Sequence, residues 1–315
     1  MSTARPPEGA HAAAEGEGAG EGTPVNAARP PEGADTAAEG AGTPVSAAAP
    51  RELLIVTIAR LLKGVRHVAV GASSPIPAAA AMLLRARSEA EGAPPVRLSI
   101  LGSVQHNFFT NGSGELFDCA GQGRIDAFFL GGGQIDGHGN VNLVGTGSYP
   151  ESSVRWPGSF GSAYLYFVVP RVILFREEHS RRVLVDRVDF VSAPGSSAKG
   201  IYRTGGPHAL LTSMGVFMFD PQRACFRLVS MHPGRSLADL RAATGFDFDV
   251  DPALGETPPP SASELALLRG CVLTELAQTY PDFAARFHTD LARKGAADPL
   301  DRPTRSTDPL PAPRT

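Results

Sequence analysis

The sequence predicts an α/β protein built around an open, largely parallel sheet with helices on its faces. Short apolar segments at 66–70, 96–101 and 125–130 alternate with segments whose apolar residues recur at helical spacing. Three consecutive glycines, Gly131 to Gly133, directly follow the third apolar segment. Because strands that alternate with helices along a chain are joined by crossover connections, this order favours a parallel sheet.

The first half of the folded chain predicts three helices, one before the first of these strands and one in each of the two intervals between them. Leu53, Leu54 and Ile58 fall at helical spacing just after Arg51. The alanine-rich segment 76–91 predicts a second helix, which ends where Gly92 and two prolines follow. A short helix is expected at about 115–120.

The second half is richer in predicted strands, which are expected at 172–175, 183–191, 210–219 and 225–231. Asp220 and the following proline predict a turn between the last two strands. Ser236 and Asp239 have the spacing of a helix N-cap, and Ser261 and Glu264 repeat that arrangement. Two helices are therefore expected to begin there, and the proline at 281 is expected to interrupt the second one.

The two ends of the chain differ in composition from its middle. Residues 4–10 (Ala-Arg-Pro-Pro-Glu-Gly-Ala) return at 28–34, and residues 22–25 (Gly-Thr-Pro-Val) return at 42–45. Segments rich in Ala, Gly, Pro and Glu bury too little apolar surface to offset the entropy that ordering costs. We expect disordered tails at 1–50 and 291–315 and one folded domain at 51–290.

Composition and charge exclude several classes of protein. The net charge is −3 with basic and acidic residues interspersed, so nothing supports nucleic-acid binding. The sequence contains no secretory leader and no apolar run of about 18 residues, which predicts a cytoplasmic protein without a membrane span. Cys119, Cys225 and Cys271 are odd in number and lack CxxC spacing, so neither a disulfide framework nor a metal site is expected.

The glycine run is the most informative motif. Glycine lacks a Cβ atom, so a cluster at a strand end marks a sharp bend or a close approach of another molecule to the main chain. We expect the backbone amides of Gly131, Gly132 and Gly133 to polarise a carbonyl oxygen, as in an oxyanion hole. Gln134 either adds a side-chain donor or holds the turn, and residues 137–140 predict a hairpin.

Taken together, the motifs resemble the β subunit of a class I CoA-transferase, most closely the B subunits of the glutaconate CoA-transferase group. The matching segments lie between about residues 54 and 268 and are 128–142, 178–182, 188–195, 205–217, 232–234 and 244–247. The resemblance implies an open α/β sandwich of the CoA-transferase (NagB/RpiA-like) type. It also implies an acyl-CoA substrate with no separate cofactor, and an α subunit as partner, with the active site between the two chains.

The sequence departs from this family at the position expected for the catalytic nucleophile. The family mechanism uses a glutamate on the loop after the second strand, and Leu101 stands there in this chain. A leucine side chain cannot form an acyl anhydride. His106 is a candidate general base and Cys119 a candidate nucleophile, although a packed histidine and an inert thiol explain them as well. Glu115 is the nearest downstream carboxylate and is also explained by a helix start.

Two further segments allow both a functional and a structural reading. Gly158, Gly161 and Tyr164 are candidates for a substrate pocket together with Trp156, and ordinary packing explains them equally. The charged segment 176–182 alternates both signs and lacks HxH or HExxH spacing. We therefore expect this segment to form a solvated or subunit-facing surface rather than a metal site.

Three hypotheses about function follow from the sequence. The first is the β chain of a hetero-oligomeric enzyme that transfers coenzyme A between carboxylic acids. The second is hydrolysis of a carbon–carbon bond, or decarboxylation, of an acyl-CoA on the same fold, since neither reaction needs the missing glutamate. The third is a non-catalytic scaffold that stabilises an active partner.

Overall fold

The computed structural model describes residues 48–110 and 112–296. These residues belong to one compact unit. The predicted tails therefore lie outside the described residues, apart from a few positions at their inner ends. There, helix α1 begins at Pro50 and helix α8 continues to Ala296.

Helices and strands alternate over residues 50–130, as the apolar pattern predicts. The elements are α1 (Pro50–Leu61), β1 (His67–Val70), α2 (Pro75–Ala90), β2 (Arg97–Ile100), α3 (Gly112–Gly121), β3 (Ala127–Leu130), β4 (Gln134–Ile135), β5 (Val141–Asn142), β6 (Gly145–Thr146), β7 (Val154–Arg155), α4 (Ser162–Val168) and β8 (Arg171–Phe175). Strands β4 and β5 pair antiparallel, so the predicted hairpin at 137–140 is confirmed.

The second part adds strands to one side of the sheet, one helix to one of its faces and the C-terminal helices to the other. Its elements are β9 (Pro207–Leu211), β10 (Gly215–Asp220), β11 (Cys225–Met231), α5 (Leu237–Ala243), β12 (Asp249–Glu256), α6 (Ala262–Leu267), the π-helical turn η1 (Leu268–Val272), α7 (Leu273–Thr279) and α8 (Pro281–Ala296). Ser236 and Ser261 cap α5 and α6, and both accept a hydrogen bond from the residue three positions later. Both predicted helix starts are confirmed.

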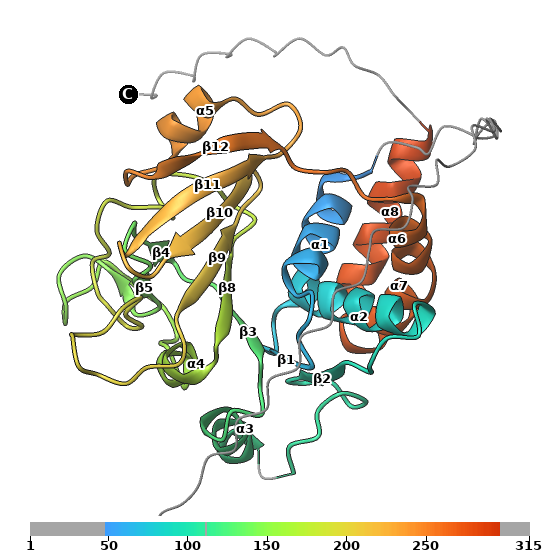
Figure 1. Ribbon diagram of the computed structural model, residues 1–315, viewed down its shortest axis with the longest axis horizontal. Helices are drawn as coiled ribbons and strands as arrows, with labels where there is room; N and C mark the ends of the chain where they lie inside the picture. The colour runs from blue at the N-terminus through green and yellow to red at the C-terminus, as the bar shows by residue number, and fades with distance from the viewer. Residues whose placement is uncertain (1–47, 111, 297–315) are drawn as a thin grey trace, which may run out of the picture. The chain divides into compact units, whose positions relative to one another are not determined.

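Among the described residues, one sheet of eight strands has the order β12-β11-β10-β9-β8-β3-β1-β2. Strands β2, β1, β3, β8 and β9 run parallel to one another, whereas β10 is antiparallel to both strands beside it. Figure 1 shows helices α1, α2, α7 and α8 on one side of this sheet and the β4–β5 hairpin on the other. The predicted α/β fold with a largely parallel sheet is confirmed.

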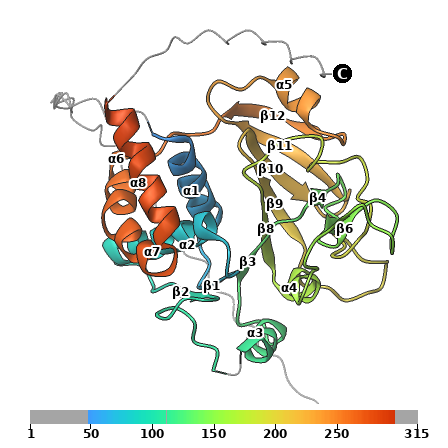
Figure 2. The ribbon, with the colours of Figure 1, turned by 180° about the vertical axis from the view of Figure 1, so that it is seen from behind.

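Apolar side chains alternate between the two faces of the sheet. Phe129 packs toward the helices, in the cluster formed with α1, α2, η1, α7 and α8. Its neighbours Phe128 and Leu130 join the other cluster, which includes α3, α4, α5 and the β4–β5 hairpin. Figures 1 and 2, which view the chain from opposite sides, show the two layers separated by the sheet.

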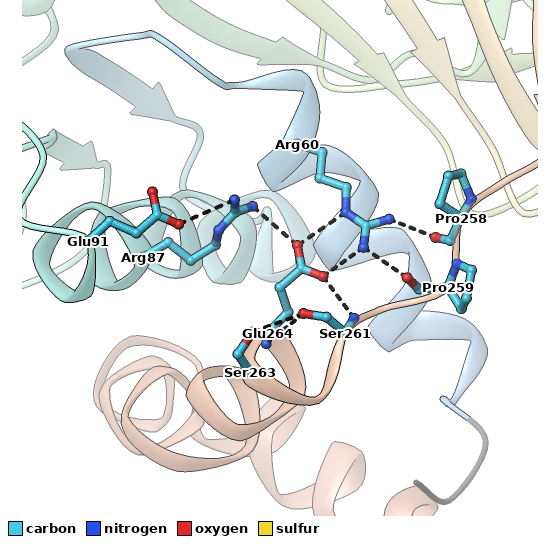
Figure 3. Close-up of polar contacts among 8 residues, drawn as sticks. All are labelled: Arg60, Arg87, Glu91, Pro258, Pro259, Ser261, Ser263 and Glu264. Carbon is cyan, nitrogen blue, oxygen red and sulfur yellow. Dashed lines mark hydrogen bonds and ion pairs between the residues drawn. The ribbon is translucent and has the colours of Figure 1, made fainter. Parts of the chain in front are cut away.

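A buried carboxylate fastens the C-terminal helices to the N-terminal ones. Glu264, at the start of α6, accepts hydrogen bonds from Arg60 of α1 at 2.6 and 3.1 Å and from Arg87 of α2 at 3.1 Å. It also accepts the backbone N–H of Ser261 at 2.9 Å, which completes a capping box (Figure 3). One carboxylate thus joins three helices in the layer that covers one face of the sheet.

Two strand predictions are wrong, and strand β12 is not predicted. The segment 183–191 forms turns because Val183 and Leu184 donate to the Ser180 carbonyl, and it packs on the β4–β5 hairpin. The segment 210–219 is two strands, β9 and β10, because the chain turns at 212–214. The sequence does not predict strand β12 because its aspartates, proline and glycine are unfavourable in strands. It nevertheless forms the last strand at one side of the sheet, next to β11.

Candidate functional site

Parallel strands bring the most informative motif to one edge of the sheet. Strands β1, β2, β3 and β8 end at the same edge, where they are followed by Gly71, Leu101, Gly131 and Arg176. Ligands of open α/β sheets bind beyond the carboxyl ends of the strands. We name the end of the sheet where these four strands finish the carboxyl edge, and it is the candidate site.

The three glycines of the run have different surroundings. Gly131 is exposed, and a Cβ atom there lies 3.0 Å from the carbonyl oxygen of Phe175 and 3.8 Å from Cδ of Arg176. Gly132 is buried, and a Cβ atom there collides with Val141. The N–H of Gly133 donates to the carbonyl of Asn142 at 2.9 Å. Of the three predicted amides, that of Gly133 is therefore committed to the hairpin.

Gln134 ties the turn to its surroundings. Its side chain is buried, and Oε1 accepts hydrogen bonds from Asn142 Nδ2 at 2.7 Å and from the backbone N–H of Asp189 at 3.0 Å. The indole of Trp156 fills the space beside Gly133, which only a residue without a Cβ atom leaves open. These contacts fix the path of the chain that presents Gly131 at the edge of the sheet.

A cavity of about 690 Å³ opens at this edge beside Gly131. Its lining residues come from the ends of β1, β3 and β8, from the start of α2, and from α1 and α8. They are Arg51, Ser73, Ser74, Pro75, Ile76, Pro77, Phe129, Leu130, Gly131, Phe175, Arg176, Glu177, Glu178, Phe283 and Arg286. We name this space the Gly131 cavity.

The charges around the Gly131 cavity are partly paired. Arg51 and Glu177 form an ion pair at 2.7 Å, and the hydrogen bond that Arg51 donates to this glutamate raises the pKa of Arg51. Glu178 accepts from the Ser180 hydroxyl at 2.6 Å and from Arg182, and these bonds lower the pKa of the Glu178 carboxyl. The predicted surface segment 176–182 therefore contributes its first three residues to the cavity wall.

Leu101 lies where the loop after β2 begins. Its N–H donates to the carbonyl of Val70 at 3.0 Å, and the half-buried side chain packs against the apolar cluster on the α3–α5 face. The next residue, Gly102, has a φ of 85°, a conformation that favours glycine. The side chain at this turn carries no group that can attack a thioester.

His106 belongs to the same loop, since its carbonyl accepts the N–H of Ile100 at 2.8 Å. Its ring Nε2 lies 2.5 Å from Oε1 of Glu275 on α7, and Arg85 binds the other oxygen of that carboxylate at 2.5 Å. The imidazole is directed into the helical layer and does not line the Gly131 cavity. This placement favours a role in holding the loop against α7.

Cys119 lies on α3 at the opposite edge of the sheet. It lines a second cavity, of about 570 Å³, with residues that precede or begin β1, β2 and β3. His67 is at that edge, hydrogen-bonded to Ser99 Oγ at 2.8 Å and to the Arg124 carbonyl at 2.7 Å. The thiol and Gly131 therefore line separate cavities.

Gly158, Gly161 and Tyr164 surround the start of α4. Gly161 is the N-cap residue of this helix, and Phe117 of α3 occupies the space that a Cβ atom there needs. The rings of Tyr164 and Phe117 are 5.8 Å apart in an edge-to-face arrangement. The structure places Gly161 and Tyr164 next to α3, and none of the three candidates lines the Gly131 cavity.

Two histidines in the matching motifs form a buried polar network. His179 contacts the hydroxyls of Thr212 at 2.7 Å and Thr244 at 3.0 Å, while His232 contacts Thr257 and the Thr212 carbonyl, both at 2.9 Å. Burial lowers the pKa of His179 to about 4 and also lowers the pKa of His232. Both rings are therefore neutral at pH 7 and connect β9, β11 and α5.

Sequence reasoning missed three cationic side chains of the cavity, Arg51, Arg176 and Arg286. They are far apart in sequence and come from α1, the end of β8 and α8, so no local motif reveals them. Within residues 48–110 and 112–296, no group of three or more His, Cys, Asp or Glu side chains is arranged to hold a metal ion. None of the helices described is both long and apolar enough to cross a membrane.

Comparison with protein families gives a match at the centre of the chain. Residues 96–243 match the sequence profile of a family described as Coenzyme A transferase. This range contains β2, Leu101, the glycine run and β8, and therefore most of the carboxyl edge. Helices α1, α2, α7 and α8 lie outside it.

Three curated proteins are similar in sequence. The B subunit of glutaconate CoA-transferase from Acidaminococcus fermentans is 32% identical over 145 residues, which cover 44% of this chain and about half (54%) of that protein. The B subunit of 3-oxoadipate CoA-transferase from Pseudomonas knackmussii is 29% identical over 71% of this chain and 94% of its own length. The cholesterol ring-cleaving hydrolase IpdB subunit of Rhodococcus jostii is 30% identical over 49% of this chain and 62% of its own length.

Solved structures give the same fold. The decarboxylase AibA/AibB superposes with a TM-score of 0.60 and 28% identity over 70% of this chain and 93% of its own. Glutaconate coenzyme A-transferase from Acidaminococcus fermentans superposes with a TM-score of 0.61 and 23% identity over 71% and 95%. The predicted CoA-transferase type of fold is confirmed.

Proposed function

Because residues 96–243 match the coenzyme A transferase family, we propose that this chain is the B-type subunit of a two-subunit enzyme that acts on an acyl-CoA thioester. The observation that carries the proposal is the exposed Gly131, which follows β3 beside a cavity at the carboxyl edge of the sheet. The similar proteins include chains named as B subunits of CoA-transferases, which supports an α-type partner.

The glycine run supplies the electrostatic part of the reaction. The amides of Gly131 and Gly132 precede the hairpin, whereas that of Gly133 is bonded to Asn142. In our proposal, the first two polarise the thioester carbonyl and stabilise the negative charge that develops on its oxygen. The hydrogen bonds of Gln134 fix this segment before substrate arrives, so no reorganisation is needed during the reaction.

Cleavage of a carbon–carbon bond, by hydrolysis or decarboxylation, is the reaction that the geometry supports best. Leu101 occupies the turn after β2, and residues 101–107 contain no carboxylate. Both reactions place charge on the thioester carbonyl without an acyl-enzyme bond, so they require the amides but not a glutamate there. Similar proteins named as a hydrolase subunit and as a decarboxylase support this reading.

Transfer of coenzyme A between carboxylic acids is the second candidate. The similarity to two B subunits of CoA-transferases favours it. This reaction requires a nucleophilic carboxylate in the assembled enzyme, so in that case a residue other than Leu101 must form the enzyme-bound thioester. The location of the protein, expected to be cytoplasmic, remains a prediction.

Borohydride trapping distinguishes the two reactions. The chain, co-purified with its partner subunit, is incubated with an acyl-CoA and treated with borohydride, which reduces an enzyme-bound CoA thioester to an alcohol. Intact-mass measurement of both subunits is expected to show no reduced glutamate, together with release of a shortened acyl-CoA or a ring-opened product. A reduced glutamate on either chain supports transfer and contradicts carbon–carbon cleavage.

A further inference from the structure

A second cavity lies at the end of the sheet opposite the carboxyl edge, and the proposed function does not use it. Its volume is about 570 Å³. Its walls come from segments that begin or precede β1, β2 and β3, from the chain just before α3, and from α3 itself. None of its lining residues lines the Gly131 cavity. We name this space the His67 cavity.

Hydrogen bonds fix the floor of the His67 cavity. The imidazole of His67, a residue only 8% exposed, places Nδ1 2.7 Å from the Arg124 carbonyl and Nε2 2.8 Å from the Ser99 hydroxyl. Burial, with a smaller contribution from the charge of Arg97, lowers the pKa of His67, so the ring is neutral at pH 7. A carbonyl oxygen only accepts, so Nδ1 carries the proton and Ser99 donates to Nε2. The floor is therefore polar and uncharged.

The two acidic side chains of the lining already have partners. Asp126 forms an ion pair with Arg66 at 3.1 Å and accepts the backbone N–H groups of Arg66 and His67 at 2.8 and 3.0 Å. Glu115 accepts the backbone N–H of Thr110 at 2.7 Å and its hydroxyl at 3.1 Å. Three arginines and two carboxylates line the cavity, so its formal charge is +1.

Two arginines of the lining, Arg97 and Arg124, form no salt bridge within residues 48–110 and 112–296. Both are exposed, so their guanidinium groups are accessible to a ligand. Like charges gathered around one cavity repel one another, and a bound anion relieves this repulsion. The cavity is therefore suited to a ligand with a negative charge.

Aromatic and apolar groups line the rest of the cavity. The guanidinium of Arg97 lies 5.4 Å from the ring centroid of Phe108, a residue that is 48% exposed. Phe109 and Cys119 are half-buried and pack against the apolar cluster on the α3–α5 face. An accessible aromatic ring beside a guanidinium offers a stacking surface for a flat ring. These groups favour a ligand whose charged end continues into an aromatic body.

We propose that the His67 cavity binds a carboxylic acid whose carboxylate is attached to a flat aromatic ring system. Arg97 and Arg124 hold the carboxylate, and the ring lies against Phe108 and Phe109. A guanidinium matches the planar carboxylate group. The formal charge of +1 suits a carboxylate better than a phosphate monoester, which carries about −1.5 to −2 at pH 7. The inference does not depend on the proposed function, since the two cavities share no lining residue.

Isothermal titration of the full-length chain tests the charge requirement. The probes are 2-naphthoate and 2-naphthamide, which share ring and shape and differ in charge. We expect 2-naphthoate to bind about 10-fold more tightly, as for a hydrogen bond to a charged group. Arg97→Gln and Arg124→Gln are each expected to weaken 2-naphthoate about three- to tenfold and to leave 2-naphthamide within about twofold. Phe108→Ala is expected to weaken both probes, because both lose the same ring contact.

Lys63→Gln is the matched control. Lys63 is an exposed cation that precedes β1 and does not line the cavity. This variant is expected to bind 2-naphthoate within about twofold of the wild type. Circular dichroism shows whether each variant remains folded, and the ratio of the two affinities is insensitive to a loss of folded protein.

The thiols locate the bound probe, which is necessary because the Gly131 cavity also contains arginines. Cys119 lines the His67 cavity, whereas Cys271 is exposed on η1. Alkylation by iodoacetamide is followed for each cysteine by peptide mass spectrometry. Saturating 2-naphthoate is expected to slow the alkylation of Cys119 and to leave that of Cys271 unchanged. In Arg97→Gln, a higher concentration of the probe is expected to be needed for the same protection.

Four outcomes overturn the inference. Two are the absence of 2-naphthoate binding and equal affinity for 2-naphthoate and 2-naphthamide. The third is an unchanged rate of Cys119 alkylation at saturating 2-naphthoate, which places the probe elsewhere. The fourth is binding of 2-naphthyl phosphate more than about 10-fold tighter than that of 2-naphthoate, which assigns the cavity to phosphate monoesters. The proposed function stands in all four cases.

Discussion

Replacing Glu264 by glutamine tests how the helical layer is held together. The wild-type carboxylate has a side chain only 8% exposed and contacts Arg60, Arg87 and the Ser261 amide. Removing one partner of a fully buried ion pair costs about 3–5 kcal/mol. Here the two arginine side chains are 31% and 28% exposed and keep other partners, namely the carbonyls of Pro258 and Pro259 and the carboxylate of Glu91.

We therefore expect Glu264→Gln to lower the free energy of unfolding by about 2 kcal/mol. For a domain of this size the melting temperature falls by about 4–8 °C. Urea denaturation of the full-length chain, followed by circular dichroism at 222 nm, measures the change. Glu91→Gln is the control, because Glu91 contacts the same Arg87 at 3.6 Å from a side chain that is 63% exposed. This change is expected to cost about 0.5 kcal/mol or less.

The pH dependence gives a second check on the same residue. Burial alone raises the pKa of the Glu264 carboxyl, but hydrogen bonds from Arg60 and Ser261 outweigh it and the pKa lies below the ordinary value. A depressed carboxyl pKa stabilises the folded state above the unfolded pKa, and this contribution is lost as the pH falls through the folded pKa. The gap between wild type and Glu264→Gln should narrow in acid. Equal stabilities of Glu264→Gln and Glu91→Gln at pH 7 would refute the reasoning.

Three other predictions concern the site and the buried histidines. Burial lowers the pKa of His179 to about 4, so between about pH 6.5 and 4 the unfolded chain binds a proton that the folded chain does not, and the free energy of unfolding should fall by about 2 kcal/mol as the pH is lowered through this window. Denaturant titrations at several pH values should show that the free energy of unfolding depends less steeply on pH in His179→Gln, and an unchanged dependence contradicts this. Gly131→Ala should lower kcat/KM about 10-fold, because the new Cβ lies 3.0 Å from the Phe175 carbonyl and displaces the backbone amide. Gly255→Ala is the control, since there is room for a Cβ at that position, and an equal loss of kcat/KM in the two variants would contradict the proposed site. Leu101→Ala should change kcat by less than about threefold, because the leucine side chain supplies no reacting atom. A folded variant that has lost all turnover would contradict the proposal of carbon–carbon cleavage.

Local chemistry predicted much of the fold. The N-caps at Ser236 and Ser261 and the hairpin at 137–140 depend on hydrogen bonds between residues three or four positions apart, and all three are present. The strand expected at 183–191 does not form, because the backbone at 183–184 turns back on Ser180 and bridges β4, a contact between distant parts of the chain. The edge strand β12 forms through pairing with β11, despite an unfavourable composition.

The candidate site was predicted in part. Gly131 could be found because three glycines after an apolar segment are a strong local signal. The arginines of the cavity could not, since α1, β8 and α8 bring them together from positions 51, 176 and 286. His106 and Cys119 are close in sequence to the expected nucleophile, but the structure directs one toward Glu275 and places the other at the opposite sheet edge.

A crystal structure of the two-subunit enzyme with a non-hydrolysable acyl-CoA tests the central claim most directly. The account predicts that the acyl carbonyl oxygen lies about 3 Å from the backbone nitrogen of Gly131 or Gly132, as an oxyanion donor requires. A carbonyl found elsewhere, for example in the cavity lined by His67 and Cys119, would contradict it.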